Sequence, residues 1–268
     1  MAVGITRRYT NGPFGQVHLY EAGERGTGQR PMVCFHQSPL SGRTFDVFMR
    51  ALAGERYLVA PDTPGYGQSD APPEALSIAG YADAHGTVID AMALGEIDVI
   101  GVHTGARIAV EFTRQRRGQV KHVVLVGAAV YTDEERAKQR AWTGAALQST
   151  EDSDGTHLTS LWNNWAQFRG PGVTDAMIER YLSDSLRNRG NAAYAMKAVF
   201  SHDMGVALAD LDQPILVFNV QDDIYAATAR SAEVIKNGQV VDLSPTGLWP
   251  LETCTDEIAD MVRDHCAG

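Results

Sequence analysis

Residues 97–111 are the stretch that most constrains the fold of this chain. Residues 98–102 form a short run rich in β-branched side chains, which is typical of a strand covered on both faces. From Thr104 onward, apolar residues recur at helical spacing, and this pattern leaves Arg107 and Arg114 free to face water. Gly101 and Gly105 flank His103 at two residues' distance, and such small residues permit a sharp turn. We therefore expect His103 to stand alone at the sheet edge.

Strands and helices alternate through most of the chain. A hairpin is predicted over residues 5–21, and an amphipathic helix over residues 78–94. Further short apolar strands are expected at residues 31–35, 57–60, 120–126, 214–218 and 239–243. Such alternation favours right-handed crossovers and a largely parallel sheet. The fold class is therefore α/β.

The alternation stops after Gly127, because residues 131–205 contain helical patterns and no buried strand. We interpret this segment as an inserted helical cap, with residues 1–130 and 206–268 as the core. The inserted segment is rich in aromatic side chains, namely Trp142, Trp162, Trp165, Phe168, Tyr181 and Tyr194.

Composition narrows the possible partners. The formal net charge of −10 argues against nucleic acid and anionic membranes as partners. No apolar run approaches the roughly 20 residues that a spanning helix needs, and no signal segment opens the chain. Three dispersed cysteines, at positions 34, 254 and 266, suit a reducing compartment, so we expect a cytoplasmic protein. No cluster has metal-ligand spacing, and no cofactor is expected; oligomerisation is left open.

An ordered set of motifs resembles the α/β-hydrolase family, specifically its capped branch near the ring-cleavage C–C hydrolases and small esterases. The set consists of the oxyanion loop at 36–39, the loop DTPGYGQSD at 62–70, the Gly-x-x-x-Gly turn at 101–105, the cap insertion, and the acid-bearing strand at 214–223. The resemblance covers nearly the whole chain. It implies an eight-stranded, mostly parallel twisted sheet flanked by helices.

The catalytic positions depart from the pattern that this resemblance implies. His103 occupies the place of the usual serine nucleophile, and the usual histidine position holds Leu248 or Thr246, depending on the alignment. The family's acid is matched by Asp223, with Asp222 as its competitor. A Ser-His-Asp acyl-enzyme mechanism is therefore not expected.

The imidazole side chain is longer than that of serine, so it could reach the acid directly and form a two-residue dyad in place of the usual triad. We hypothesise that His103 contacts Asp223 directly and acts as an acid or base on the substrate. The backbone N–H groups of Ser38 and Thr104 would form the oxyanion site. His36 could contact substrate or could tie the oxyanion loop to nearby backbone. Substrate-binding candidates are Gln37, His36, Tyr131, Trp162, Trp165, Leu248 and Trp249.

Three functions stay open at this stage. The first is hydrolysis of a small ester, lactone or C–C bond next to carbonyl groups, with His103 as general base. The second is lyase, decarboxylase, isomerase or cyclase chemistry with the same residues. The third is a catalytically inactive protein that binds a ligand under the cap. The aromatic cap favours an apolar or aromatic small molecule in each case.

Overall fold

A single twisted sheet forms the centre of the protein. The computed structural model describes residues 4–141, 152–188, 192–243 and 247–267. The sheet has eight strands in the order β1-β2-β4-β3-β5-β6-β7-β8. Their bounds are Thr6–Gly12, Gly15–Ala22, Met32–Phe35, Leu58–Pro61, Ile97–Val102, Val120–Val126, Ile215–Asn219 and Gly238–Asp242 for β1 to β8. Only β2 pairs antiparallel with its neighbours, β1 and β4, whereas strands β3 to β8 pair in parallel. The predicted hairpin and the mostly parallel eight-stranded sheet are confirmed.

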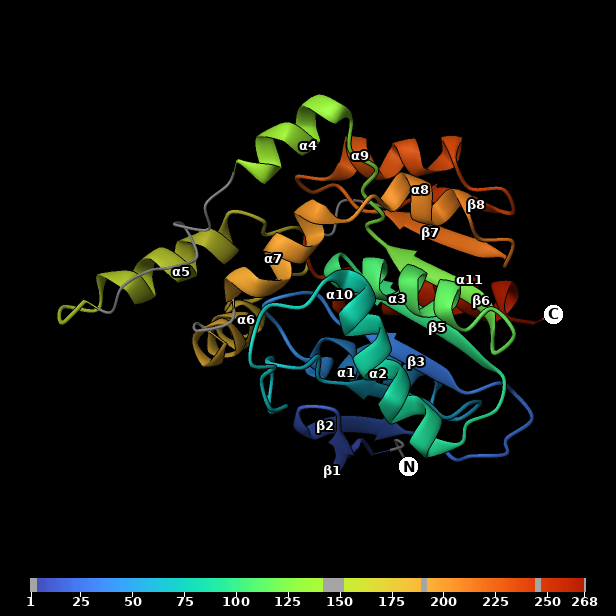
Figure 1. Ribbon diagram of the computed structural model, residues 1–268. Coiled ribbons are helices and arrows are strands. Elements are labelled where there is room, and N and C mark those ends of the chain that lie inside the picture. The colour runs from blue at the N-terminus through green and yellow to red at the C-terminus, as the bar shows by residue number, and fades with distance from the viewer. Residues whose placement is uncertain (1–3, 142–151, 189–191, 244–246, 268) are drawn as a thin grey trace.

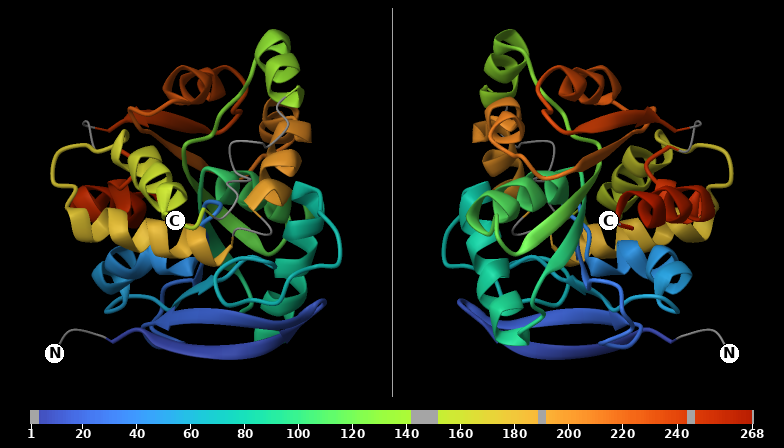
Figure 2. Two further views of the ribbon diagram at one scale, coloured as in Figure 1. Left: turned by 90° about the vertical axis from the view of Figure 1, so that its left-hand side faces the viewer. Right: turned by 90° about the vertical axis from the view of Figure 1, so that its right-hand side faces the viewer.

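Helices cover both faces of this sheet, which explains why the central strands are apolar along their whole length. Val99 on β5 belongs to the core cluster beneath α2 (Ile78–Met92) and α3 (Thr104–Gln115). Its neighbour Ile100 belongs to the cluster beneath α1 (Asp46–Leu52) and α11 (Thr255–His265). Successive residues of a strand point to opposite faces, so a strand buried on both faces does not alternate between apolar and polar residues. Figure 2 shows the β1–β2 hairpin at one edge of the sheet and β8 at the other.

The described parts of the segment between β6 and β7 are mainly helical. They contain α4 (Asp133–Arg140), α5 (Thr156–Ala166), α6 (Asp175–Arg187), α7 (Ala192–Ser201) and α8 (Met204–Ala209). Figure 1 shows α5, α6 and α7 beyond the ends at which β5, β6 and β7 terminate, whereas α8 packs beside α3. Trp142, which belongs to the predicted aromatic set, lies outside the described residues.

A third apolar cluster joins this helical segment to the rest of the molecule. It consists of Leu40, Trp165, Val173, Met177, Ile178, Tyr181, Leu248 and Trp249. The Trp165 indole N–H donates to Ser185 Oγ at 3.0 Å, so the polar end of this buried ring has a partner. These contacts hold α5 and α6 against the loop that carries Leu248.

None of the described helices is both long and apolar enough to cross a membrane. Cys34, Cys254 and Cys266 are free thiols, in agreement with their dispersed positions in the sequence.

Candidate functional site

His103 sits in a strained turn between β5 and α3. Its φ and ψ are 49° and −106°, a backbone conformation that is rare for a residue with a side chain. The turn is possible because its flanking residues are glycines. A Cβ on Gly101 would lie 2.2 Å from the carbonyl oxygen of Gly105, and a Cβ on Gly105 would lie 1.9 Å from that of Phe35. The predicted strand, turn and helix are therefore observed, and the strain marks a candidate functional position.

The imidazole of His103 meets a carboxylate from the loop after β7. Its Nε2 lies 3.1 Å from Oδ2 of Asp222, whose side chain is 1% exposed. The other carboxylate oxygen of Asp222 accepts a hydrogen bond from the N–H of Ile224 at 2.9 Å. The predicted partner was Asp223, so this pairing is a correction. The short turn after β7 directs the first aspartate inward, whereas Asp223 lines the neighbouring cavity.

Opposing effects act on the protonation of His103. Burial lowers the pKa of the imidazole, but contact with Asp222 and the nearby charge of Asp223 outweigh burial. Arg107 adds a smaller effect that lowers the pKa. The net result is a pKa raised above the usual 6.5.

A cavity of about 480 Å³ opens beside this pair. Its size is within the range of small-molecule sites, and most of its lining surface is apolar. The core contributes His103, Thr104, Arg107 and Ile224, and the helical segment contributes residues of α5 and α7. The further lining side chains include Leu161, Asn164, Phe168, Met196, Val199 and Phe200.

Eight of the predicted site residues line the cavity: His103, Asp223, Gln37, Ser38, Thr104, Tyr131, Trp165 and Leu248. Neither the N–H of Ser38 nor that of Thr104 donates a hydrogen bond to another described group. Both donors are therefore available for an oxygen atom in the cavity. Leu248, one of the two positions matched to the lost histidine, brings an apolar side chain to this wall; Thr246, the other, lies outside the described residues.

Three predicted substrate-binding residues do not line the cavity. His36 is 1% exposed; its Nδ1 donates to the carbonyl oxygen of Gln37 and its Nε2 accepts from the N–H of Thr63. Its buried ring thus ties the loop after β3 to the loop after β4. Trp162 packs against the third apolar cluster, and Trp249 lies inside it against Tyr181.

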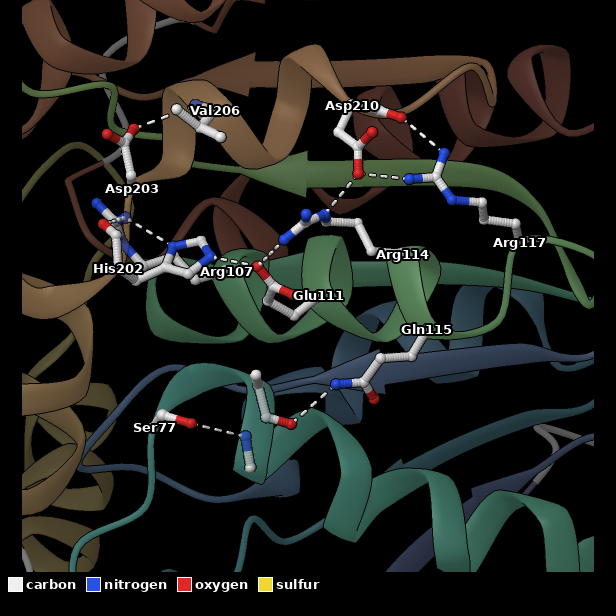
Figure 3. Close-up of polar contacts among 12 residues, drawn as sticks. Ser77, Arg107, Glu111, Arg114, Gln115, Arg117, His202, Asp203, Val206 and Asp210 are labelled. Atoms are coloured by element: carbon white, nitrogen blue, oxygen red, sulfur yellow. Dashed lines mark hydrogen bonds and ion pairs between the residues drawn. The ribbon is translucent and has the colours of Figure 1, made fainter.

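Arg107 was expected to face water, but it is 3% exposed and lines the cavity. The expectation failed because helical periodicity reports only on the helix itself. Arg107 is covered by two distant segments, one after β6 at Ala129 and one after α7 at His202. Arg114 lies about two helical turns after Arg107. It is partly exposed and pairs with Glu111 and Asp210 (Figure 3). Sequence reasoning also missed the cavity residues of α7, since their apolar pattern is that of any packed helix.

One cluster of potential metal ligands escaped the sequence search. Asp98, His122 and Cys266 bring ligand atoms within 4.8 Å of one another at the opposite end of β5. Two guanidinium groups already occupy the carboxylate of Asp98, from Arg30 at 3.1 Å and from Arg56 at 3.2 Å. Because these cations compete directly with a metal ion, the cluster has the chemistry of a buried ion-pair network.

Comparisons with known proteins match this architecture. The model of the α/β hydrolase fold family matches residues 30–253. Among curated proteins, a non-heme chloroperoxidase of Streptomyces lividans is 28% identical over 235 residues, which are 77% of this chain and 80% of that protein. An uncharacterized protein of Mycobacterium tuberculosis is 28% identical over 120 residues, which are 44% of this chain and about a third (35%) of that relative's length.

Solved structures share the fold over nearly the whole chain. A thermophilic esterase from Thermogutta terrifontis has a TM-score of 0.75 at 21% identity, with 98% of this chain and 99% of that chain covered. An enol-lactonase from Burkholderia xenovorans has a TM-score of 0.77 at 16% identity, with 97% and 100% covered. At such identities the likeness shows the fold alone.

Proposed function

The chain belongs to the α/β-hydrolase fold family, and on that premise we propose that it hydrolyses a small apolar or aromatic ester or lactone with His103 as general base. The observation that carries the proposal is the position of the His103 ring, which lines the cavity while its Nε2 contacts the buried carboxylate of Asp222. No cofactor is required by this chemistry.

The two residues divide the work. Asp222 holds one ring nitrogen and favours the imidazolium form, which leaves Nδ1 as the nitrogen that a bound water could reach. Neutral His103 accepts a proton from water while the water oxygen bonds to the carbonyl carbon. The imidazolium then gives this proton to the departing alkoxide as its bond to carbon breaks. Such positioned proton transfer contributes about 10²- to 10⁴-fold to a rate.

The negative charge that develops on the carbonyl oxygen needs its own partners. The N–H groups of Ser38 and Thr104, both on cavity-lining residues, would donate to it. Thr104 is the first residue of α3, so its N–H is one of the helix donors without an intrahelical partner. Loss of one such donor typically costs about 10²- to 10³-fold in kcat.

The helical segment at 131–205 would act as a cap over this site. In support, side chains of α5 and α7 line the same cavity as His103. The apolar character of this wall favours an aromatic or aliphatic substrate over a sugar or nucleotide.

The direct test is the His103→Ala variant with phenyl acetate and dihydrocoumarin as probe substrates. We expect kcat/KM to fall at least about 100-fold, because the proton acceptor is removed. His157→Ala serves as the control, since His157 lies at the start of α5 outside the cavity lining. Equal turnover by His103→Ala and the wild type would refute the proposal.

Solvent ¹⁸O separates hydrolysis from the alternatives that use the same base. Hydrolysis places one ¹⁸O atom in the acid product, whereas elimination, decarboxylation or cyclisation places none there. Turnover without incorporation would replace hydrolysis by the non-hydrolytic alternative. Ligand binding without any product would favour an inactive binding protein.

A further inference from the structure

Arg107 is a buried cation in the wall of the cavity that contains His103. It lies one turn into α3 and is 3% exposed. Its Nη1 donates to the carbonyl oxygen of His202 at 3.2 Å and also contacts Nδ1 of that ring at 3.2 Å. Its Nη2 donates to the carbonyl oxygen of Ala129 at 3.0 Å. These partners are two carbonyl oxygens and one imidazole nitrogen, and none of them is a carboxylate.

Two carboxylates near Arg107, those of Glu111 and Asp203, pair with other groups, as Figure 3 shows for Glu111. Oε1 of Glu111 lies 2.9 Å from Nε2 of His202 and 2.8 Å from Nη1 of Arg114. The carboxylate of Asp203 pairs with Arg136 and accepts from the N–H of Val206. Within the described ranges, no carboxylate lies at ion-pair distance from Arg107, although the nearby charge of Asp203 acts to raise the pKa of Arg107.

A guanidinium held away from water with no carboxylate at ion-pair distance is costly to bury. The ring of Tyr131, 5.3 Å from the Arg107 guanidinium carbon, offsets part of this cost through its π face. Burial also lowers the pKa of Arg107. An anion that enters the cavity would supply the missing charge, and a planar carboxylate matches the planar geometry of guanidinium donors.

We propose that Arg107 forms a carboxylate-binding subsite, so that the natural substrate is an apolar or aromatic carbonyl compound that also carries a carboxylate group. This inference rests on the proposed function for the identity of the reacting site, but not for the binding of the anion. The mostly apolar wall would hold the body of the molecule, Arg107 its carboxylate, and His103 its reactive carbonyl group.

The test is calorimetric binding of 3-phenylpropanoate and its neutral isostere 3-phenylpropanamide to the full chain at pH 7.5. We expect the wild type to bind the acid at least about tenfold more tightly than the amide, as for a charge-assisted contact in a desolvated site. Arg107→Gln should remove this preference and leave the affinity for the amide unchanged. Arg114→Gln is the matched control, because Arg114 lies on the same helix, pairs with Glu111 and Asp210, and does not line the cavity.

Equal affinities for acid and amide in the wild type, or an acid preference that survives in Arg107→Gln, would overturn the subsite. Circular dichroism checks that Arg107→Gln folds; if it does not, the wild-type ratio decides alone. The same titration with His103→Ala separates the two proposals. A retained acid preference in that variant supports the subsite whether or not His103 proves to be the base.

Discussion

Strand β5 carries an aspartate–histidine pair near each of its ends, and the surroundings of the two pairs differ. At its start, Asp98 lies 2.9 Å from His122 Nδ1 and also meets Arg30 and Arg56. Just past its end, His103 lies 3.1 Å from Asp222 and borders a cavity of about 480 Å³. The contact between the two side chains is therefore nearly the same. The difference lies in what else surrounds the pair: two cations in one case, and space for a ligand in the other.

This difference separates a structural pair from a candidate catalytic one. The carboxylate of Asp98 is fully buried, and its cationic neighbours balance it. His103 instead keeps 21% of its side chain exposed and a strained backbone, and its ring can reach a ligand. Strain of that kind persists where the surrounding structure enforces it, often at functional sites.

Activity should depend most strongly on the pair of His103 and Asp222 at the cavity. Asp222→Asn should lower kcat on phenyl acetate by about 10²- to 10⁴-fold, because the amide no longer fixes the tautomer of His103 or stabilises its imidazolium. Asp98→Asn, compared at equal folded fraction, should leave kcat unchanged. Comparable losses of kcat in both variants would contradict the assignment of a catalytic pair to one end of β5 and a structural pair to the other.

For stability, Asp98→Asn should have a larger effect than Asp222→Asn, the reverse of the order expected for kcat. Asp98→Asn should lower the free energy of unfolding by about 3–5 kcal/mol, because it leaves the buried guanidinium of Arg56 and its neighbour Arg30 without their carboxylate. Asp222→Asn should cost less, since the ion-pair partner of Asp222 among the described residues is His103, which can become neutral. Urea denaturation followed by fluorescence measures both. A larger loss in Asp222→Asn would contradict this assignment of roles.

The pH dependence of kcat should reflect the contact between His103 and Asp222. His103 must lose its proton to act as a base, and its pKa is raised, so kcat should increase with pH through a midpoint above 6.5. Asp222→Asn should move this midpoint to lower pH, and Asp223→Asn should move it less. A pH–rate profile between pH 5 and 9 tests this, and an unmoved midpoint in Asp222→Asn counts against the pairing.

The raised pKa of His103 also makes the stability of the fold depend on pH, but stability should fall as pH rises whereas kcat should increase. A raised pKa means that the folded state binds the proton more tightly than the unfolded chain does. The pair therefore adds its full stability below pH 6.5, and this contribution is lost as pH rises through the pKa of folded His103.

The smallest effect tests the packing around the imidazole. Gly127 has a φ of 75°, and a Cβ there would lie 3.1 Å from Ile224 Cδ1 and 3.4 Å from His103 Nε2. Gly127→Ala should destabilise the protein by about 1 kcal/mol or slightly more. Gly118 has no atom within 4 Å of such a Cβ, so Gly118→Ala is the matched control. Equal melting temperatures for the two variants would show that the atoms around the His103 imidazole can move apart to accommodate a methyl group.

The sequence predicted the sheet well because each central strand is a short apolar run and each crossover has helical periodicity. The turn at His103 was also predictable, since two glycines at fixed spacing leave few other conformations. The choice between Asp222 and Asp223 was not, because both lie in the turn after β7, where no strand periodicity determines which side chain points inward. Arg107 was misjudged for a different reason: what covers it comes from residues 129 and 202, which no local pattern connects to α3.

Intact-protein mass spectrometry after treatment with a fluorophosphonate decides whether an imidazole or a serine performs the chemistry. We expect an unmodified mass and undiminished turnover of phenyl acetate. A stoichiometric adduct on a serine, such as Ser38 or Ser185 in the cavity wall, together with loss of turnover, would contradict it.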